Sequence, residues 1–512
     1  MPHIAFYAAL VLYSIIQTPK LHSMHVPFPE QGTSQQQLFS ELDSFSANDA
    51  DWRSGRTFSL VFYPGVEVAE VVQKAYLRYF FENGLNPTVF KSLNRMENEV
   101  VSMTADLLHA PETAVGNMTS GGTESIICAV KAAKKYAQSK NAAISKPNIV
   151  APETVHPAFF KAADYFDIEM RVAKGAGDSL LPLIEDMRKL IDGNTVMLVG
   201  SAPAYPHGII DPLEEISKLA LEKNIWMHVD ACVGGYMLPF LEQLGEPVPV
   251  FDFRLAGAAS ISLDLHKYGY GAKGSSVVLY RNGDFRKKQF YAYTAWPGGL
   301  YASPSISGTR PGGAIAAAWA VLNYMGKQGY KKFAAETMAA ARKIQLAVNT
   351  TPGLKVVGNP LLTVFSFMST GNIDIYRLGD ELTALGWNLD RQLQPPSLHL
   401  TVSYGNVAFA DEFVRDLAIA VAKTQSNTAE NIGDRVKQGV AKYAARLLPE
   451  KLVGKIAGGS IQDIPNQSGN GKTAPLYGLA GELAGSGTLD EMLIDLLDVM
   501  NRPTKESFKD KE

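Results

Sequence analysis

Apolar strand-like runs alternate with helical segments through the middle of this 512-residue chain. The strand-like runs lie at residues 148–151, 195–200 and 225–229, and the helical segments lie at residues 156–166 and 213–223. Strands that are apolar along their whole length are typical of a parallel sheet whose two faces are both covered by helices. The sequence therefore predicts an α/β fold in which a mostly parallel sheet is flanked by helices.

The length of the chain and its later part indicate more than one domain. A chain of 512 residues is too long for one small core, and residues 355–368 and 398–402 are typical of strands in a second, mixed sheet. We expect an N-terminal arm at residues 1–62 and a large domain with its leading helices at 63–310. A smaller C-terminal α+β domain with a tail is expected at 311–512.

The charge balance argues against a polyanion as partner. There are 48 basic and 51 acidic residues, the formal net charge is −3, and no long run of Lys and Arg occurs, so we expect no nucleic-acid partner. The two cysteines, Cys128 and Cys232, lie in apolar contexts without the spacing of a metal site. We expect both to be reduced, which favours a cytoplasmic location.

The apolar stretch at residues 4–16 is too short to span a bilayer in the usual way. It has neither the basic region nor the small-residue cleavage site of a signal peptide. Two interpretations stay open. The stretch is either an interfacial segment that makes peripheral membrane contact, or an extended start that precedes the true initiator at Met24.

The stretch at residues 260–281 carries the most distinctive candidate for chemistry. An apolar run at 258–263 predicts a buried strand, and a turn rich in Gly and Tyr follows before a second predicted strand at 276–280. Lys267 lies just past the first strand, where it is placed to be a desolvated amine. Because desolvation disfavours the ammonium form, a neutral lysine there could form a Schiff base with a carbonyl cofactor. The alternative is an ordinary lysine in a surface loop.

Other polar residues end the neighbouring strands or begin a helix. Asp230 ends one predicted strand, and His156 follows another. Ligand groups in parallel α/β sheets gather at the carboxyl ends of strands, so Asp230, His156 and Lys267 are expected to share one site. Residues 121–125, Gly-Gly-Thr-Glu-Ser, open a helix whose unpaired N–H groups suit a phosphate. An ordinary capped helix without a ligand is the alternative.

These residues together match the needs of an electrophilic ring cofactor that carries a phosphate. Such a cofactor needs a lysine for the Schiff base and an acid that keeps the ring nitrogen protonated. It also needs a flat side chain on the ring and a helix N-terminus for the phosphate. Lys267, Asp230, His156 and the loop at residues 121–125 can supply these features in that order.

A set of motifs carries a resemblance to a known family. The motifs are TSGGTES at 119–125, PHGIID at 206–211, HVDACVGG at 228–235, HKYGY at 266–270, KGSS at 273–276, GLYASP at 299–304 and GTRPGG at 308–313. With them the chain resembles the sphingosine-1-phosphate lyases, in the decarboxylase-like group of fold-type-I pyridoxal-phosphate enzymes. The resemblance runs from about residue 63 to residue 424. It implies a fold-type-I architecture whose large domain binds pyridoxal 5′-phosphate.

The resemblance also implies roles in cofactor binding. Lys267 would form the Schiff base, Asp230 would pair with the pyridine nitrogen, and His156 would stack on the ring. The family also implies a homodimer in which Thr309 and Tyr63 act across the subunit boundary. The residues matching the phosphate pocket are Gly122, Thr123 and His266, together with Thr309 of the neighbouring subunit.

Three further residues match positions around the substrate's phosphate and reacting hydroxyl in this family: Tyr63, Tyr205 and Lys273. Each has a simpler alternative. The two tyrosines could be packed core residues, and Lys273 could be solvated.

One departure from the family lies near the substrate phosphate. Many members have Asn-Pro-Leu-His, whereas this chain reads Asn83-Gly84-Leu85-Asn86. Asn86 can hydrogen-bond a phosphate, but it carries no charge and cannot act as a base near neutral pH. We therefore predict that Asn83 and Asn86 bind substrate, and the effect on head-group preference stays open.

The reaction implied by the resemblance is retro-aldol cleavage of the C2–C3 bond of a phosphorylated sphingoid base. The products would be a fatty aldehyde and phosphoethanolamine. An amino-acid decarboxylase of the same fold group would share Lys267, Asp230 and His156, but the KGSS and GLYASP motifs favour the lyase. A non-catalytic protein that binds the cofactor or a lipid phosphate is a further alternative. Intact Lys267 and Asp230 argue against it.

Overall fold

The computed structural model describes residues 28–47, 49–425, 473–474, 477, 480–481 and 487–500. The apolar stretch at residues 4–16 and most of the tail after residue 425 lie outside the described residues, so the predictions made for them stay predictions. Among the helices of the described part, none combines the length and the apolar character that crossing a membrane requires.

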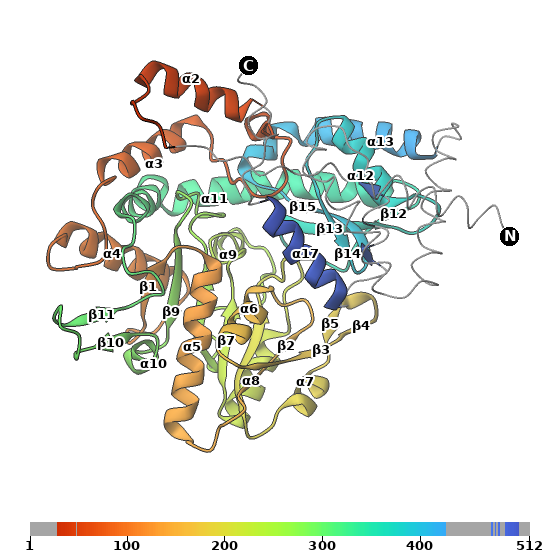
Figure 1. Cartoon of the computed structure of the whole chain (residues 1–512). Helices are drawn as coiled ribbons and strands as arrows, with labels where there is room; N and C mark the ends of the chain where they lie inside the picture. Colours follow the sequence, from red (N-terminus) through yellow and green to blue (C-terminus); the bar gives the residue numbers. More distant parts are fainter. Residues whose placement is uncertain are drawn as a thin grey trace, which may run out of the picture.

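A seven-stranded sheet lies at the centre of the large domain (Figure 1). Its order is β1-β9-β8-β7-β6-β2-β3; β9 runs antiparallel to both of its neighbours, and the pairings from β8 to β3 are parallel. The strands are β1 Val115–Thr119, β2 Asn148–Pro152, β3 Glu169–Ala173, β6 Thr195–Ser201, β7 Trp226–Asp230, β8 Ala258–Leu263 and β9 Ser276–Tyr280. The predicted α/β fold with a mostly parallel sheet is confirmed.

Neighbouring residues of a central strand pack into two separate hydrophobic cores, one on each face of the sheet. Leu198 of β6 and Val150 of β2 belong to the core that includes α4, α8 and α9, whereas Val199 and Ile149 belong to the core that includes α5 and α6. These helices are α4 Lys91–Leu107, α5 Gly122–Lys140, α6 Ala158–Tyr165, α8 Leu213–Lys223 and α9 Leu238–Gln243. Because both faces are covered, the strands are apolar along their whole length.

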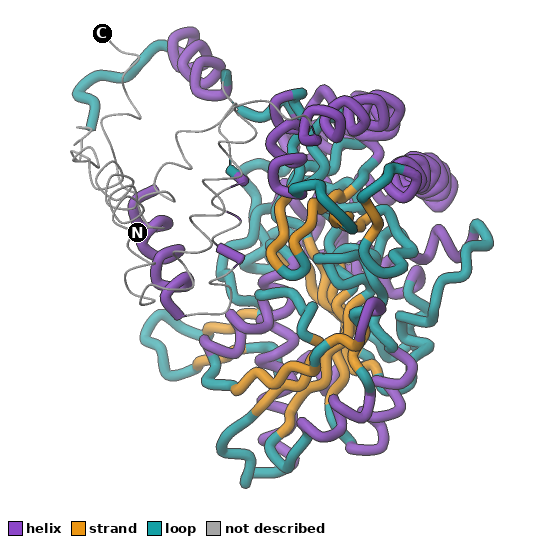
Figure 2. The backbone as a smooth tube through the Cα atoms, turned by 90° about the vertical axis from the view of Figure 1, so that its right-hand side faces the viewer, coloured by secondary structure: helices purple, strands orange, loops and turns teal. Residues whose placement is uncertain are grey.

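A smaller antiparallel sheet, ordered β12-β13-β15-β14, builds the C-terminal domain with α12 and α13, and Figure 2 shows it above the larger sheet. The elements are β12 Leu354–Val356, β13 Val364–Ser369, α12 Ile375–Ala384, β14 Asp390–Leu393, β15 Pro396–Thr401, η3 Tyr404–Phe409 and α13 Ala410–Gln425. Phe58 stacks on Trp387 in its core, with ring centroids 5.4 Å apart. The end of the predicted N-terminal arm therefore packs against the C-terminal domain.

The region labelled α11 (Gly312–Thr350) consists of two helical segments that meet at a kink, which confirms the two helices expected at residues 314–325 and 333–349. It is interrupted at Gly326, whose φ of 55° and ψ of 179° are not helical and are accessible to glycine without a Cβ clash. Its residues as far as Met338 pack in the core of the large domain, and those from Ala340 pack in the core of the small one. This kinked region therefore joins the two domains.

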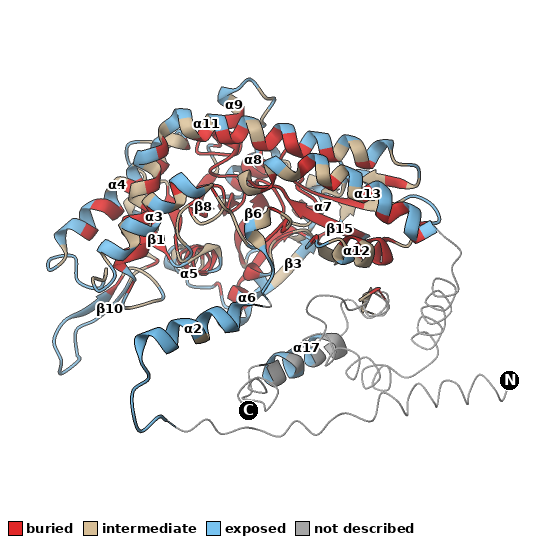
Figure 3. Cartoon of the chain, turned by 90° about the horizontal axis from the view of Figure 1, so that it is seen from above, coloured by how far each residue is buried: buried red, intermediate tan, exposed pale blue. Residues whose placement is uncertain are grey.

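The remaining elements lie at the periphery of the sheets. They are α2 Gln35–Ser46, η1 Trp52–Ser54, α3 Val66–Arg78, β4 Gly175–Ala176, η2 Gly177–Ser179, β5 Leu181–Pro182, α7 Ile184–Leu190, α10 Gly283–Lys287, β10 Tyr291–Tyr293, β11 Tyr301–Ser303 and α17 Gly487–Met500. The short helix expected near residues 38–45 is α2, and it has no buried residue. Figure 3 shows it exposed along nearly its whole length.

The carboxyl ends of the parallel strands are aligned by their register. Ser201 of β6 pairs with Asp230 of β7, which in turn pairs with Ser262 of β8. The antiparallel β9 begins at the same edge, where its first residue, Ser276, pairs with Thr119 at the end of β1. The loops that follow β1, β2, β6, β7 and β8, and the loop before β9, therefore meet at one edge of the sheet.

Candidate active site

Lys267 lies in the turn that follows β8 at this edge. Its Nζ is 2.9 Å from Oδ2 of Asp264, three residues earlier in the chain. Asp264 is buried, and the turn is closed by a hydrogen bond from the Tyr270 N–H to the Lys267 carbonyl (2.9 Å). The local fold thus brings a buried carboxylate to the candidate reactive amine.

Two opposing effects act on the charge state of Lys267. Burial lowers the pKa of its amine, but the charge of Asp264 and, more weakly, that of Asp230 raise it, so the net pKa lies above the ordinary value. In turn, burial raises the pKa of Asp264, whereas Lys267 and His266 lower it, and the net pKa lies below its usual value. The Asp264 carboxylate therefore favours the ammonium form of Lys267, and the predicted Schiff-base role of the amine stays a prediction.

The start of α5 lies directly against this turn. A Cβ added at Gly122 would lie 2.8 Å from Oδ2 of Asp264 and 2.9 Å from Sγ of Cys232. One added at Gly121 would lie 3.3 Å from Cε1 of His266. A side chain at Gly122 would displace the buried carboxylate, so glycine allows the helix N-terminus to approach the turn of Lys267.

This end of α5 fits the predicted phosphate. No side chain caps the helix at Gly121, and Thr123 is exposed in its first turn. Nδ1 of His266 is buried and has no hydrogen-bond partner within the described part of the chain. Free N–H groups at a helix N-terminus beside an unpaired imidazole nitrogen suit a phosphate, because buried polar groups otherwise find partners.

Asp230 and His156 face the same turn. Asp230 is buried at the end of β7, and its Oδ1 accepts the N–H of Cys232 (3.0 Å). Nδ1 of His156 accepts the N–H of Ala158 at the start of α6 (3.1 Å). Burial lowers the pKa of His156, and its ring feels the charges of Asp230, Lys267 and Asp264. His156 therefore offers a neutral, flat ring beside the charged groups.

Lys273 lies between this turn and β9. Its Nζ donates to the carbonyl of Leu60 (2.7 Å) and more weakly to the carbonyl of His266 (3.4 Å), and it lies 5.5 Å from the ring centre of Phe62. Burial and the nearby charge of Lys267 lower its pKa. No ion-pair partner of Lys273 occurs among the residues that the structure describes. It is therefore an exposed cation whose charge acts on the candidate reactive amine.

The two predicted tyrosines lie in different surroundings. Tyr63 follows the segment that Lys273 contacts, and its ring packs edge-on against Trp52 with centroids 5.3 Å apart. The hydroxyl of Tyr205, in the loop after β6, donates to Oδ2 of Asp390 in the small domain (2.8 Å). Burial, reinforced by Asp390, raises the pKa of Tyr205, so the hydroxyl stays protonated. The roles predicted for both tyrosines stay predictions.

Asn83, Asn86 and Thr309 lie on loops outside this cluster. Oδ1 of Asn83 accepts the N–H of Leu85 (3.1 Å), and Oδ1 of Asn86 accepts the N–H and hydroxyl of Thr88 (3.0 and 2.7 Å). Both asparagines thus shape their own turns, which leaves the Asn86 Nδ2 as a donor for a ligand. Thr309 is exposed on the loop before α11. Their predicted roles stay predictions.

Sequence reasoning did not assign functions to Asp264, Glu124 and Arg310. Asp264 lies in the same turn as Lys267, three residues before it, and that spacing was the available signal. Glu124 bonds the N–H and hydroxyl of Ser120 (2.7 and 2.6 Å) and the N–H groups of the loop before α11. Arg310 pairs with Glu97, 213 residues away in the sequence, and no local sequence pattern predicts that contact.

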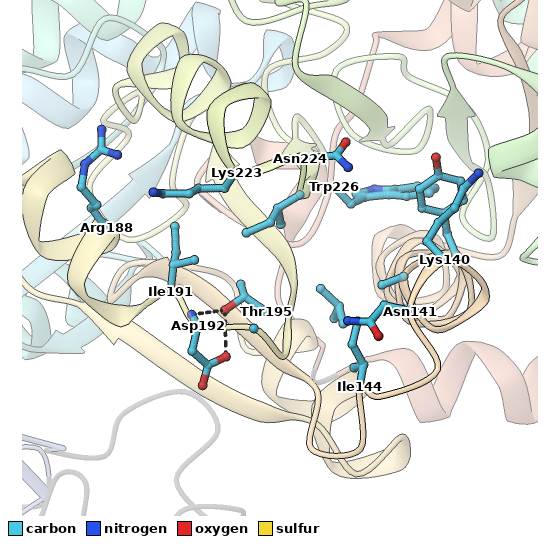
Figure 4. Close-up of a pocket in the computed structure, with 15 residues that line it drawn as sticks. Lys140, Asn141, Ile144, Arg188, Ile191, Asp192, Thr195, Lys223, Asn224 and Trp226 are labelled. Atoms are coloured by element: carbon cyan, nitrogen blue, oxygen red, sulfur yellow. Dashed lines mark hydrogen bonds between the residues drawn. The ribbon is translucent and has the colours of Figure 1, made fainter.

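A cavity of about 650 Å³ lies at the opposite edge of the sheet (Figure 4). Thr195 at the start of β6 and Trp226 at the start of β7 line it, with Lys140, Arg188 and Lys223 around its mouth. Four residue steps of about 3.3 Å place Trp226 roughly 13 Å from Asp230. None of the predicted site residues lines this cavity, so it is separate from the Lys267 cluster.

The class of protein defined by this fold and this site is the pyridoxal-dependent one. Residues 52–369 match the family model described as the pyridoxal-dependent decarboxylase conserved domain. Glutamate decarboxylase from Lactobacillus brevis shares the fold, with a TM-score of 0.69, 21% identity, and coverage of 80% of this chain and 97% of that one. Pyridoxal 5′-phosphate is the cofactor of this family.

Closer relatives define the family more narrowly. A sphingosine-1-phosphate lyase of Oryza sativa is 38% identical over 93% of this chain and 82% of its own length. Sphingosine-1-phosphate lyase 1 of Rattus norvegicus is 38% identical over 84% and 75%, respectively. The structure of a Burkholderia pseudomallei sphingosine-1-phosphate lyase has a TM-score of 0.76 and 38% identity, covering 81% of this chain and 97% of that one. This chain belongs to the sphingosine-1-phosphate lyase family.

Proposed function

We propose that this protein cleaves the C2–C3 bond of phosphorylated sphingoid bases and releases a fatty aldehyde and phosphoethanolamine. Membership of the lyase family supports the proposal. The observation that carries it is the position of Lys273, a cation near Lys267 with no ion-pair partner in the described chain. Such a cation suits a phosphorylated substrate. The amino-acid substrate of a decarboxylase has no phosphate group for it to bind.

The residues at the sheet edge fit the cofactor. Pyridoxal 5′-phosphate, when bound, accepts the electron pair that the broken C2–C3 bond leaves behind. The N-terminus of α5 and His266 would hold its phosphate, and the Asp230 carboxylate would keep a proton on its ring nitrogen. His156, neutral because burial lowers its pKa, would cover one face of the ring.

Lys267 is the group that we assign to proton transfer at the substrate. Asp264 holds a proton on Nζ of Lys267 across 2.9 Å, so the side chain is a charged donor beside the reacting centre. As the C2–C3 bond breaks, the C3 hydroxyl gives its proton to a general base or to water, and C2 then takes up a proton, which a general acid in hydrogen-bond reach can deliver. Asp264 thereby sets the protonation state of the amine that carries the chemistry.

Substrate binding would use groups remote from the broken bond. Lys273 supplies a positive charge for the phosphate, and Asn86 retains a free amide N–H. Interactions with a non-reacting part of the substrate contribute binding energy that helps to orient the reacting part. Tyr63 adjoins the backbone that Lys273 contacts, so we place it at the same end of the substrate.

We also propose that the protein is a homodimer with shared active sites. The β10–β11 hairpin exposes several large apolar side chains, and Phe81 is 91% exposed. The exposed hairpin residues include Tyr291, Tyr293, Trp296 and Leu300. Monomeric soluble proteins rarely expose such a surface unless it binds something, so a second copy is a suitable occupant.

A reducing, cytoplasmic location is a further proposal. Cys128 and Cys232 are both buried free thiols, and burial raises the pKa of Cys128 to about 12. Such thiols suit a compartment in which disulfides are rare. Cell fractionation of the full chain, with and without residues 2–16, tests the location and the contribution of that stretch.

The decisive experiment is an absorption spectrum of the purified protein before and after addition of sphingosine 1-phosphate, with the aldehyde product quantified. We expect a cofactor band that changes on addition and a stoichiometric long-chain aldehyde. Lys267→Ala should lower turnover by at least about 10⁴-fold. Lys273→Gln should raise KM for the phosphorylated substrate about tenfold or more, because it removes a charge-assisted contact.

Two results would contradict the proposal. Release of carbon dioxide from amino acids without aldehyde from sphingosine 1-phosphate would move the assignment to a decarboxylase of the same fold. A cofactor band that stays unchanged with every phosphorylated sphingoid base and amino acid would indicate a protein that binds the cofactor without catalysis.

A further inference from the structure

A buried ion pair connects three segments that the sequence analysis assigned to separate tasks. Glu97 of α4 and Arg310, just before α11, form two hydrogen bonds of 2.7 and 2.9 Å. Both side chains are only 10% exposed. A two-pronged guanidinium–carboxylate contact fixes the orientation as well as the distance of its partners.

The first segment held by this pair is the end of β1, which leads into the phosphate end of α5. Oε1 of Glu97 accepts the N–H of Met118 (3.0 Å), and Nη1 of Arg310 points to the carbonyl of the same residue (3.4 Å). Met118 is followed by Thr119, Ser120 and the glycines that open α5. Glu97 and Arg310 therefore contact both the N–H and the carbonyl of Met118, just before the candidate cofactor-phosphate loop.

The second segment is the turn that carries Asn83 and Asn86. Nη2 of Arg310 donates to the carbonyl of Gly84 (3.1 Å), and the N–H of Gly84 donates to the Arg310 carbonyl (2.8 Å). The second bond exists because glycine stands where the family motif has proline, which has no N–H to donate. In this chain the turn is therefore tied to Arg310 through both its N–H and its carbonyl.

The third segment is the loop of Thr309 itself. Arg310 is its neighbour in sequence, and Oε1 of Glu124 accepts the N–H groups of Ile306 and Ser307 (2.9 and 3.2 Å). Oε2 of Glu124 accepts from Ser120, so the same carboxylate also touches the phosphate loop. A gap of only about 30 Å³ separates Ser120, Ser307, Arg310 and Gly274, the residue after Lys273.

We propose that Glu97 and Arg310 are positioning residues that fix the cofactor-phosphate loop, the turn of Asn83 and Asn86 and the loop of Thr309 relative to one another. The inference rests on the proposed function for the identity of the substrate, but its effect on the cofactor is independent of turnover. The pair thereby positions groups for the cofactor phosphate and the substrate phosphate, with Thr309 directed to the neighbouring subunit's site. Disturbing the pair therefore weakens both, because small displacements of binding groups reduce affinity steeply.

The test compares cofactor forms that differ only in the phosphate. Dissociation constants for pyridoxal 5′-phosphate and for pyridoxal are measured by absorbance titration in wild type, Glu97→Gln and Arg310→Lys. We expect the constant for pyridoxal 5′-phosphate to rise about tenfold or more while that for pyridoxal changes less than about twofold. KM for sphingosine 1-phosphate should rise in parallel, with a smaller change in kcat.

The small domain offers a matched control. Asp380 of α12 and Arg391 of β14 form a buried pair at 2.8 Å, with side chains 10% and 11% exposed. Asp380→Asn should lower the melting temperature about as much as Glu97→Gln but leave both dissociation constants and KM unchanged. Arg310→Lys keeps the positive charge and so serves where Glu97→Gln folds poorly.

Three results decide the matter. Unchanged affinity for pyridoxal 5′-phosphate in both folded variants would overturn the inference, as would equal weakening of pyridoxal and its phosphate. Selective weakening of the phosphate form supports it even if wild type makes no aldehyde, a result that would overturn only the proposed function.

Discussion

Asp264 and Lys267 are three residues apart, and each shifts the protonation of the other. Lys267 was predicted from the sequence because a lysine after an apolar strand beside a Gly-rich turn is unusual. Its protonation state could not be predicted, because burial and a nearby carboxylate act in opposite directions. Only the structure places Asp264 at 2.9 Å and so decides the balance.

A single substitution tests this balance. Asp264→Asn removes the charge that raises the pKa of Lys267, so burial and the remaining neighbours should leave that pKa lower than in wild type. We expect the pH midpoint of the absorbance change of bound pyridoxal 5′-phosphate to move to lower pH by about one unit or more. The measurement is an absorbance titration between pH 5 and 10.

Asp252→Asn is the matched control for that titration. Asp252 is also buried, and its Oδ1 accepts the N–H of Arg254 (3.0 Å) rather than contacting Lys267. This control substitution should leave the pH midpoint of the absorbance change unaltered. An Asp264→Asn midpoint equal to that of wild type would show that the ion pair does not control the amine.

At the scale of elements, β7 and β8 are joined by a buried histidine as well as by their backbones. Nδ1 of His228 lies 2.8 Å from Oγ of Ser260, and Nε2 lies 3.1 Å from Oγ of Ser262. Burial lowers the pKa of His228 from its ordinary 6.5 to about 4, although Asp230 opposes the shift. The imidazole is therefore neutral in the folded protein near pH 7.

This shift predicts a loss of stability in acid. The unfolded chain binds a proton on His228 below about pH 6.5, and the folded chain does so only near pH 4, so the free energy of unfolding falls as the pH drops through this window. A depression of 2.5 units corresponds to about 3 kcal/mol. His228→Gln should lose this share of the pH dependence, measured by urea unfolding at pH 7, 5.5 and 4.5.

The difference between wild type and variant is the quantity to compare. His207 has a similarly lowered pKa of about 4, whereas burial raises the pKa of Asp211 to about 7 and works in the opposite direction. The contributions of His207 and Asp211 to the pH dependence are the same in wild type and in His228→Gln, so they cancel when the two unfolding free energies are subtracted. A His228→Gln protein that loses stability in acid as steeply as wild type would contradict the assignment.

The elements of the fold were predictable where a strand is buried on both faces. The strands expected at 258–263 and 276–280 are β8 and β9 with the same bounds, because their apolar runs end at polar turns. The break within α11 was predictable as well, because a glycine inside a helical pattern often marks a helix end, and Gly326 has non-helical φ and ψ angles.

Part of the site was predictable for the same reason. Lys267, Asp230 and His156 follow strand ends, and the order of the chain places such residues at one edge of a parallel sheet. The pair of Glu97 and Arg310 spans 213 residues and leaves no trace in local sequence, so only the packed structure reveals it. Long-range polar contacts of this kind are set by tertiary packing.

Thr309 and the β10–β11 hairpin are exposed in the single chain and are candidates for contacts with a second subunit. Thr309 is exposed, and the resemblance implies that it reaches the cofactor phosphate of a neighbouring subunit. The aromatic β10–β11 hairpin is also exposed. These features are explained together if the active site of one subunit is completed by the loop of Thr309 from the other.

Hybrid dimers test this arrangement. In a co-expressed mixture of Lys267→Ala and Thr309→Glu chains, half of the dimers are hybrid. If Thr309 acts across subunits, each hybrid contains one site with both native residues, and activity recovers to about a quarter of wild type. If Thr309 acts within its own chain, every site carries a defect and nothing is recovered.

The control for recovery pairs two changes that lie in one subunit's site. Mixing Lys267→Ala with Asp230→Ala chains should restore nothing, since Lys267 and Asp230 belong to the same cluster within one chain. Recovery in the first mixture and none in the second would assign Thr309 to the neighbouring site. If neither mixture recovers activity although hybrid dimers are verified by mass, Thr309 acts in the site of its own subunit. The exposed hairpin would then be a dimer contact without a catalytic role.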